Sequence, residues 1–421
     1  MKQRSACKQK KPIPLMTMKK KFKVNLLVWI VIAIILGGLC GNFFAEWLVR
    51  LFLTFNSIFS NFLGFSIPLI ILGFVTPSIS EIGKGVGKLL LVTVLLSYGF
   101  TIGAGMLSYF TSTTFFPLML GTEMHAVAIE GNTVTPTPYF TIPMPPLMDI
   151  MTALVFSFVV GVGVTVLKSS GKVVAHFFSE FRDIMVWVIA KIIVPLLPFY
   201  IFGIFLNMTY TGEVAMMLKA FMKIILVIFL LHIVWLFILY LIGSFFSRKT
   251  HNPFKLLWTM MPAYFTALGT SSSAATIPVT LRQTVKMGVS EATAGFTVPL
   301  CATIDLSGSA LKIVACSLAL MMVKGMGYDF GMFAYFIAMV GITLVAAPGV
   351  PGGAIMAALG LLSSILGFSE ADNALIIALY IAMDSFGTAC NVTGDGAISL
   401  IVDRFFSPSL PQGEMKIKKE I

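Results

Sequence analysis

The chain has 421 residues, of which 57% are hydrophobic and 11% are charged, whereas about 25% of residues are charged in soluble domains. Together with a mean hydropathy of +0.95 and repeated apolar stretches of span length, this composition excludes a water-soluble globular fold. The formal net charge of +11 does not indicate a nucleic-acid partner, because the basic residues fall in short segments between apolar stretches, as in membrane proteins. The sequence predicts an all-α polytopic membrane protein with the lipid bilayer as its solvent.

The N-terminal segment 1–23 contains nine Lys and Arg residues and no acidic residue. A signal peptide is one interpretation, but the apolar stretch from Val24 to Phe44 is long enough for a full span and no small-residue cleavage site follows it. We therefore expect a basic cytoplasmic arm at 1–23, followed by the first transmembrane helix. The five cysteines show no metal-binding or disulfide pattern; they are Cys7, Cys40, Cys301, Cys316 and Cys390.

Six ordinary transmembrane helices are expected within residues 24–254, at 24–46, 52–80, 88–110, 147–168, 183–208 and 213–246. No Lys or Arg occurs between Ser108 and Asp149, whereas the segments after the second, fourth and sixth helices are basic. The positive-inside rule then places the N-terminus in the cytoplasm. We expect the C-terminal tail, 407–421, on the same side.

Residues 255–406 show a different pattern, because small and polar residues interrupt the apolar segments at 269–278, 301–309, 346–353 and 384–395. Irregular backbone at membrane depth needs protein or a water-filled cavity around it, and such interruptions in two halves of a chain mark binding sites. Basic residues flank the first interruption and acidic residues flank the third. We therefore expect two opposed re-entrant helical hairpins, each followed by a broken helix, in an inverted repeat.

Three acidic residues, Asp305, Asp384 and Asp395, lie inside the interrupted segments, and ionisable groups within a membrane are functional by default. Hard cations such as Na⁺ bind carboxylate, amide and main-chain oxygens. A candidate cation site therefore consists of Asp305, Asn391 and Asp395 with main-chain oxygens near Cys301. The spacing of Asp384, Asn391 and Asp395 places all three on one helix face.

The two expected hairpin tips carry the other candidate binding residues. Ser271, Ser272 and Ser273 can offer hydroxyls and N–H groups to a carboxylate at the start of a half-helix, although a serine-rich turn is the alternative. Pro351 and Gly352 lie in a tip that combines fixed and permissive backbone torsions, typical of a gate or of a simple turn. An intramembrane serine hydrolase is disfavoured, because all four histidines precede Ser271 and no H-E-x-x-H motif occurs.

These segments resemble the dicarboxylate/amino acid:cation symporter family, the prokaryotic glutamate transporter homologues. Residues 271–280 are similar to its first hairpin tip, 349–352 to its second, and Asn391-Val-Thr-Gly-Asp395 to its eighth-helix signature. The resemblance implies eight transmembrane helices plus the two hairpins, a homotrimer in a prokaryotic plasma membrane, and elevator-type motion. Helices 1, 2, 4 and 5 would form a scaffold, while helices 3 and 6 would join the transport core at 255–406.

The resemblance also implies roles for single residues. Asp384 would bind the amino group of the substrate, Asn391 with Ser272 and Ser273 its carboxylate, and Thr388 would face its side chain. Na⁺ would be held by Asp305, Asn391 and Asp395, and a second ion by Thr303 with carbonyls of the second tip.

The sequence departs from the family pattern at several positions. Gly387 stands where acidic-substrate members have an arginine, and the seventh-helix motif reads Asp305-Leu-Ser-Gly-Ser309, so that a third cation site near Val94, Ser97 and Tyr98 is in question. Lys312 stands where members often have an aromatic residue. It could contact the substrate, act as an internal cation paired with Asp305, or extend toward the membrane surface.

We therefore expect a cation-coupled symporter, not an enzyme, that imports a small neutral amino acid such as serine, threonine or alanine. The coupling ion is expected to be Na⁺, with H⁺ as the alternative. Without an arginine at Gly387, no fixed charge pairs with an acidic side chain. An acidic amino acid or dicarboxylate recognised by Lys312 is the alternative substrate, and an ion or anion channel is a more distant alternative.

Overall fold

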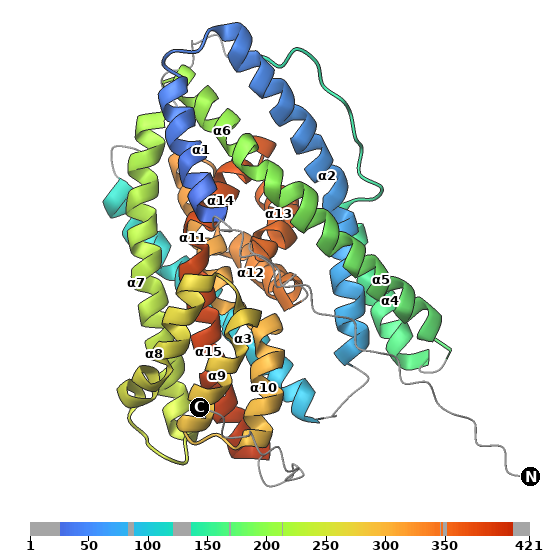
Figure 1. The fold of residues 1–421 in the computed structure, drawn as a ribbon, viewed down its shortest axis with the longest axis vertical. Coiled ribbons are helices and arrows are strands. Elements are labelled where there is room, and N and C mark those ends of the chain that lie inside the picture. The colour runs from blue at the N-terminus through green and yellow to red at the C-terminus, as the bar shows by residue number, and fades with distance from the viewer. Residues whose placement is uncertain are drawn as a thin grey trace, which may run out of the picture.

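The computed structural model describes residues 26–82, 88–120, 136–167, 170–212, 214–345, 347 and 352–406 (Figure 1). Secondary structure within these ranges is helical, without a strand. The expected arm at 1–23, the tail at 407–421 and most of the second hairpin tip, including Pro351, lie outside the described residues.

The first half of the chain forms long apolar helices at the places where spans were expected. They are α1 (Leu26–Cys40), α2 (Glu46–Ile82), α3 (Lys88–Leu120), α4 (Ile150–Leu167), α5 (Lys172–Val188), the π-helical turn η2 (Ile189–Ile193), α6 (Val194–Tyr210) and α7 (Val214–Phe246). The fifth expected span begins eleven residues earlier than predicted, at Lys172 instead of residue 183. This extension is amphipathic: it buries Ala175 and Phe178 and exposes charged residues that hid it from a search for apolar stretches.

The second half alternates helical pairs with interrupted helices. Its elements are α8 (Pro253–Thr270), α9 (Ser273–Lys286), α10 (Glu291–Ile304), α11 (Ser307–Val323), α12 (Phe330–Val345), α13 (Gly353–Leu366), α14 (Glu370–Ala382) and α15 (Asp384–Phe406). α8 packs on α9, and α12 packs on α13. Helices α14 and α15 meet at an angle of 62°. The order of a helical pair followed by a broken helix therefore occurs twice.

Five of the described helical segments are long and apolar enough to cross a membrane, or six if the bent pair α14–α15 forms one span. They are 46–77, 88–119, 172–210, 218–246 and 291–323. Shorter apolar helices occur within α1, α4, α12 and α13. The composition of these helices is that of an integral membrane protein.

Local sequence explains where the helices of the second half stop. Ser271 ends α8 in the left-handed region, with φ of 50°, and the Ser272 side chain caps α9 by accepting from the Ala275 N–H, as serine N-caps do. Asp305 and Leu306 leave the helical region between α10 and α11. Gly352 begins α13 with φ of 73°, a conformation that favours glycine.

Helix α11 lies at the centre of the second half, and all of its residues are buried. It packs against α3, α7, α14 and α15, whereas α1 packs on α6 and α2 packs on α4 and α5. In Figure 1 the hairpin α8–α9 lies toward the lower end and α13 and α14 toward the upper end. The interruptions therefore come together near the middle of the molecule.

Candidate functional site

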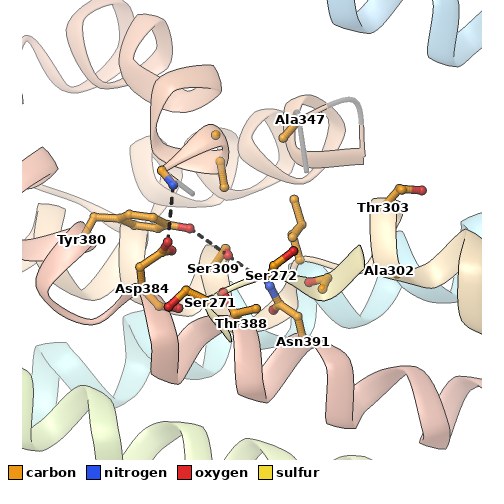
Figure 2. A pocket seen from close by; sticks show the side chains of 15 residues that line it. Ser271, Ser272, Ala302, Thr303, Ser309, Ala347, Tyr380, Asp384, Thr388 and Asn391 are labelled. Carbon is orange, nitrogen blue, oxygen red and sulfur yellow. Dashed lines mark hydrogen bonds between the residues drawn. The ribbon is translucent and has the colours of Figure 1, made fainter. Parts of the chain in front are cut away.

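The four interrupted segments line one pocket, shown in Figure 2. The space between its atoms is about 440 Å³ when the part open to solvent is included. Each segment contributes to its lining. The lining residues are Ser271, Ser272, Ser273, Ala302, Thr303, Leu306, Ser309, Ala347, Gly352, Gly353, Ala354, Tyr380, Asp384, Thr388 and Asn391. Residues up to 120 positions apart in the sequence thus share one polar chamber within the helical core.

The first hairpin tip closes one side of the cavity. The Ser271 hydroxyl lies 2.7 Å from the Ser385 hydroxyl, which fixes the tip against the start of α15. Ser272 and Ser273 line the cavity at the N-terminus of α9. Because the N–H groups of a first helical turn carry partial positive charge, this end of α9 is suited to a carboxylate.

Asp384 also lines the cavity, at the first position of α15, and lies beside Ser271 in Figure 2. It is 8% exposed, and its Oδ2 accepts from the Gly352 N–H at 3.4 Å. The dashed line to Asp384 in Figure 2 marks this contact. The carboxylate therefore links the second hairpin to the bend between α14 and α15.

A hydrogen-bond network joins the break in one helix to the next. The Tyr380 hydroxyl and the Asn391 Nδ2 both donate to the Ser309 hydroxyl, at 2.9 and 3.2 Å. The Asn391 Oδ1 accepts from the Gly308 N–H at 2.8 Å. Asn391 thus satisfies an N–H at the start of α11 and also lines the cavity.

Two further carboxylates, Asp305 and Asp395, do not line the cavity and are each 1% exposed. Their four oxygens make no hydrogen bond among the described residues. The Ser307 and Thr393 hydroxyls also make no hydrogen bond among the described residues. Ser307 lies close to the Asp305 carboxylate. A Cβ placed on Gly394 would lie 3.0 Å from the Asp305 Oδ2, so this carboxylate lies against α15 next to Asp395.

Buried carboxylates without partners are costly, and carboxylate and hydroxyl oxygens are the ligands that hard cations prefer. The residues around Asp305 and Asp395 therefore fit a cation. Among the described residues, no three His, Cys, Asp or Glu side chains form a metal-binding cluster. A cation here would need hydroxyl or main-chain oxygens to complete its shell.

Cys301 and Thr303 lie on opposite sides of the end of α10. The Cys301 carbonyl accepts from the Asp305 N–H at 2.8 Å, and its Sγ is 4.0 Å from the Ser97 hydroxyl. Thr303 is exposed and lines the cavity. Tyr98 donates to the Ala338 carbonyl at 3.3 Å, so Ser97 and Tyr98 contact different elements.

Lys312 and Gly387 do not line the cavity; they lie behind Asp384. The Lys312 side chain is 0% exposed, and its Nζ is 3.5 Å from the Asp384 Oδ1. A Cβ on Gly387 would lie 2.5 Å from both Cε and Nζ of Lys312. The space left by the missing side chain of Gly387 is therefore occupied by the end of the lysine.

The expected pairing of Lys312 with Asp305 is wrong, because the partner of the ammonium is Asp384. The expectation rested on the spacing of seven residues, which is two turns of a continuous helix or a shorter distance if the segment unwinds at Ser307 and Gly308. The break at Asp305 and Leu306 instead directs Asp305 toward Gly394, while Lys312 on α11 faces the bend between α14 and α15. Since Lys312 is fully buried, it does not extend to the membrane surface.

Sequence reasoning missed Tyr380, Ser309 and Ser385 as residues of the site. Tyr380 lies in the apolar run of α14, where nothing distinguishes it from a core aromatic residue. The polar interruption that begins at Asp384 could have suggested Ser385, which contacts the first tip.

Comparison with known proteins shows which family this sequence belongs to. The sequence profile of the sodium:dicarboxylate symporter family matches residues 26–405. Neutral amino acid transporter B(0) of Mus musculus is 29% identical over 280 residues, which cover 65% of this chain and 50% of the relative. Excitatory amino acid transporter 1 of Rattus norvegicus is 27% identical over 310 residues, covering 72% and 56%.

An excitatory amino acid transporter of Caenorhabditis elegans is 28% identical over 271 residues, covering 62% of this chain and 52% of the relative. The chain thus spans about half the length of the curated relatives that it matches. The relatives carry the names of neutral and of excitatory amino acid transporters, and the matched family is one of transporters, not enzymes. The chain belongs to the sodium:dicarboxylate symporter family.

Proposed function

We propose that this protein is a cation-coupled symporter that binds a small neutral amino acid in the cavity between the four interrupted segments. The observation that carries the proposal is the mixed polarity of the cavity lining, which contains both the Asp384 carboxylate and the serine hydroxyls at the N-terminus of α9. A zwitterion has the complementary arrangement of charges.

In this proposal Asp384 binds the substrate ammonium group. The substrate carboxylate binds Ser272, Ser273 and the first turn of α9, with the Asn391 amide beside it. Thr388, which donates its own hydroxyl to the Asp384 carbonyl at 2.9 Å, faces the substrate side chain. The second tip, with Gly352 and Pro351, closes over the site.

The choice of a neutral substrate is supported by the charges around the cavity. Its described lining residues include no Lys, Arg or His, so an acidic side chain would find no basic partner there. The neutral amino acid transporters among the relatives are consistent with this choice. An acidic amino acid or dicarboxylate would have to reach Lys312, which lies behind Asp384.

We propose Na⁺ as the coupling ion, held by Asp305 and Asp395 with carbonyl oxygens near Cys301. A bound cation would neutralise carboxylates that make no hydrogen bond among the described residues. The Asn391 amide, bonded to the Gly308 N–H at 2.8 Å, connects the break beside this site to the cavity. Cation binding and substrate binding would then favour the same arrangement of the break.

We further propose the family's assembly for this chain: a homotrimer in the plasma membrane of a prokaryote, with both termini cytoplasmic. The packing of α1 on α6 and of α2 on α4 and α5 supports a scaffold separate from α3, α7 and the 255–406 core. Elevator-type motion would move the second group against the first.

Counterflow in proteoliposomes with labelled amino acids and dicarboxylates tests the proposed function. Serine, threonine or alanine should be taken up with Na⁺ present and not when choline replaces it. Uptake of dicarboxylates alone would contradict the neutral substrate. Equal uptake without Na⁺ that follows a pH gradient would replace Na⁺ by H⁺, and ion flux without substrate-dependent cation uptake would indicate a channel.

A further inference from the structure

The ammonium group of Lys312 forms a buried ion pair with the Asp384 carboxylate. It has three partners, and all three come from the bend between α14 and α15. Its Nζ lies 3.5 Å from the Asp384 Oδ1, donates to the Met383 carbonyl at 3.3 Å and lies 3.6 Å from the centre of the Tyr380 ring. An ammonium group over an aromatic face is stabilised by the ring electrons, so the lysine is held in a complete site of its own.

This site opens toward Asp384 and not toward the cavity. Asp384 and Tyr380 line the cavity, whereas Lys312 does not. A substrate ammonium arriving from the cavity would approach the same carboxylate from the other side. Asp384 carries one negative charge, so it can neutralise either the lysine or the substrate, and two cations on one buried carboxylate repel each other.

We propose that Lys312 is a tethered counter-cation that neutralises Asp384 whenever no substrate ammonium is bound, and that this neutralisation allows the site to cross the membrane without substrate. The inference rests on the proposed function, because it assumes that Asp384 binds an amino group. A symporter must return its site unloaded after each delivery, and a buried carboxylate without a partner opposes that movement. By pairing with Asp384, Lys312 removes this energetic cost, and no second transported ion is needed to do so.

The pairing has two measurable consequences of opposite sign. Lysine and substrate compete for Asp384, so removing the ammonium should tighten amino-acid binding, because a larger fraction of the protein is then competent to bind. The same change leaves Asp384 unpaired in the unloaded protein, so the return step should slow. Exchange of internal for external substrate does not require that step and should persist.

The test is Lys312→Met in the full chain, reconstituted into proteoliposomes. Three quantities are measured: substrate affinity, exchange with substrate on both sides, and net uptake into vesicles without internal substrate. We expect affinity to rise about fivefold or more, exchange to stay within about twofold of the parent, and net uptake to fall by about tenfold or more.

Lys324→Met is the matched control, because Lys324 contacts Asp372 at 2.6 Å and does not line the cavity. The ratio of exchange to net uptake in this variant should equal that of the parent.

Gly387→Ala provides a second route that keeps the lysine. The new Cβ would lie 2.5 Å from Cε and Nζ and should displace the ammonium from Asp384, lowering net uptake more than exchange. Equal losses of exchange and net uptake in both variants, with unchanged or weaker affinity, would show that Lys312 only supports the fold. Unchanged net uptake in Lys312→Met would overturn the proposal as well. Exchange of labelled amino acids by the parent protein tests the proposed function on its own. If the parent shows no exchange, the proposed function is wrong; if the parent exchanges but the variants do not behave as expected, only the inference about Lys312 is wrong.

Discussion

At the scale of single residues, Asp384 has more partners than the other carboxylates of the site. One oxygen faces Lys312 and the other accepts from Gly352, whereas Asp305 and Asp395 make no hydrogen bond among the described residues. The three carboxylates are therefore not equivalent. Asp384 is positioned for an organic ammonium group, and the other two have the free oxygens that an inorganic cation requires.

Asp384→Asn should weaken amino-acid binding, because an amide cannot neutralise a desolvated ammonium group. The lost charge-assisted bond corresponds to about 1.5–3 kcal/mol, or roughly tenfold to 150-fold in affinity. Isothermal titration of the purified protein measures the change. Asp403→Asn is the control on the same helix, because Asp403 contacts Ser290 and Arg248 far from the cavity. Undiminished affinity in Asp384→Asn would remove Asp384 from the substrate site.

Asp395→Asn should act on the cation instead of the substrate. Losing one of two carboxylates weakens attraction to Na⁺, so the Na⁺ concentration for half-maximal substrate binding should rise about tenfold or more. Because coupling between sites is reciprocal, substrate affinity at saturating Na⁺ should remain close to that of the parent. If Asp395→Asn and the parent protein require the same Na⁺ concentration for half-maximal substrate binding, Asp395 is not part of a cation site.

Lys312 also shows where the sequence could not be interpreted correctly. A buried lysine at this depth requires an acidic partner, which the sequence indicates, but the choice between Asp305 and Asp384 depends on where α11 begins. The helix break after Ile304 determines which of the two carboxylates Lys312 contacts. With Asp384 as the partner, Asp305→Asn should not restore transport to Lys312→Met.

At the scale of elements, the sequence predicted the ordinary helices from apolar length and the interruptions from runs of small polar residues. Both signals are local. The start of α5 at Lys172 escaped because an amphipathic helix with an exposed charged face lacks a continuous apolar stretch. The contact of Ser271 with Ser385 was not predicted, because the distance between the first hairpin tip and the start of α15 is set by the packing of whole helices.

The contact between α1 and α6 allows a prediction at this scale. A Cβ on Gly37 would lie 2.7 Å from the Phe202 carbonyl oxygen, whereas a Cβ on neighbouring Gly38 meets only the Thr209 hydroxyl, at 3.9 Å. Gly37→Ala should force the helices apart and destabilise the protein by about 1–3 kcal/mol. Gly38→Ala is the control and should be neutral or stabilising, since alanine favours the helix. Thermal unfolding of both variants in detergent compares them; equal midpoints would contradict close packing at Gly37.

At the scale of the whole molecule, the helices fall into two groups that pack mainly within themselves. The first contains α1, α2, α4, α5 and α6, and the second contains α3 and the helices from α7 onward. Apolar side chains remain exposed along α4, including Val155, Val159 and Val162. Such a face is suited to lipid or to further copies of the chain.

The proposed trimer predicts a mass three times that of the 45.7 kDa chain. Native mass spectrometry after gentle removal of detergent measures it, and chemical cross-linking in the membrane is the independent check. Substitution of Val159 by lysine on the exposed face of α4 should reduce assembly if that face contacts another copy. A single-chain mass in both experiments would contradict the trimer.

The close contact between Lys312 and Gly387 couples the evolution of two positions that are 75 residues apart. Any side chain at position 387 would overlap the lysine end, since even a Cβ lies 2.5 Å from its Nζ. A lineage could therefore gain the lysine only after, or together with, the glycine, and could restore a larger residue at 387 only by giving up the lysine. Among family members, we expect every sequence with a lysine at the position of Lys312 to have glycine at the position of Gly387, whereas glycine can also occur without the lysine.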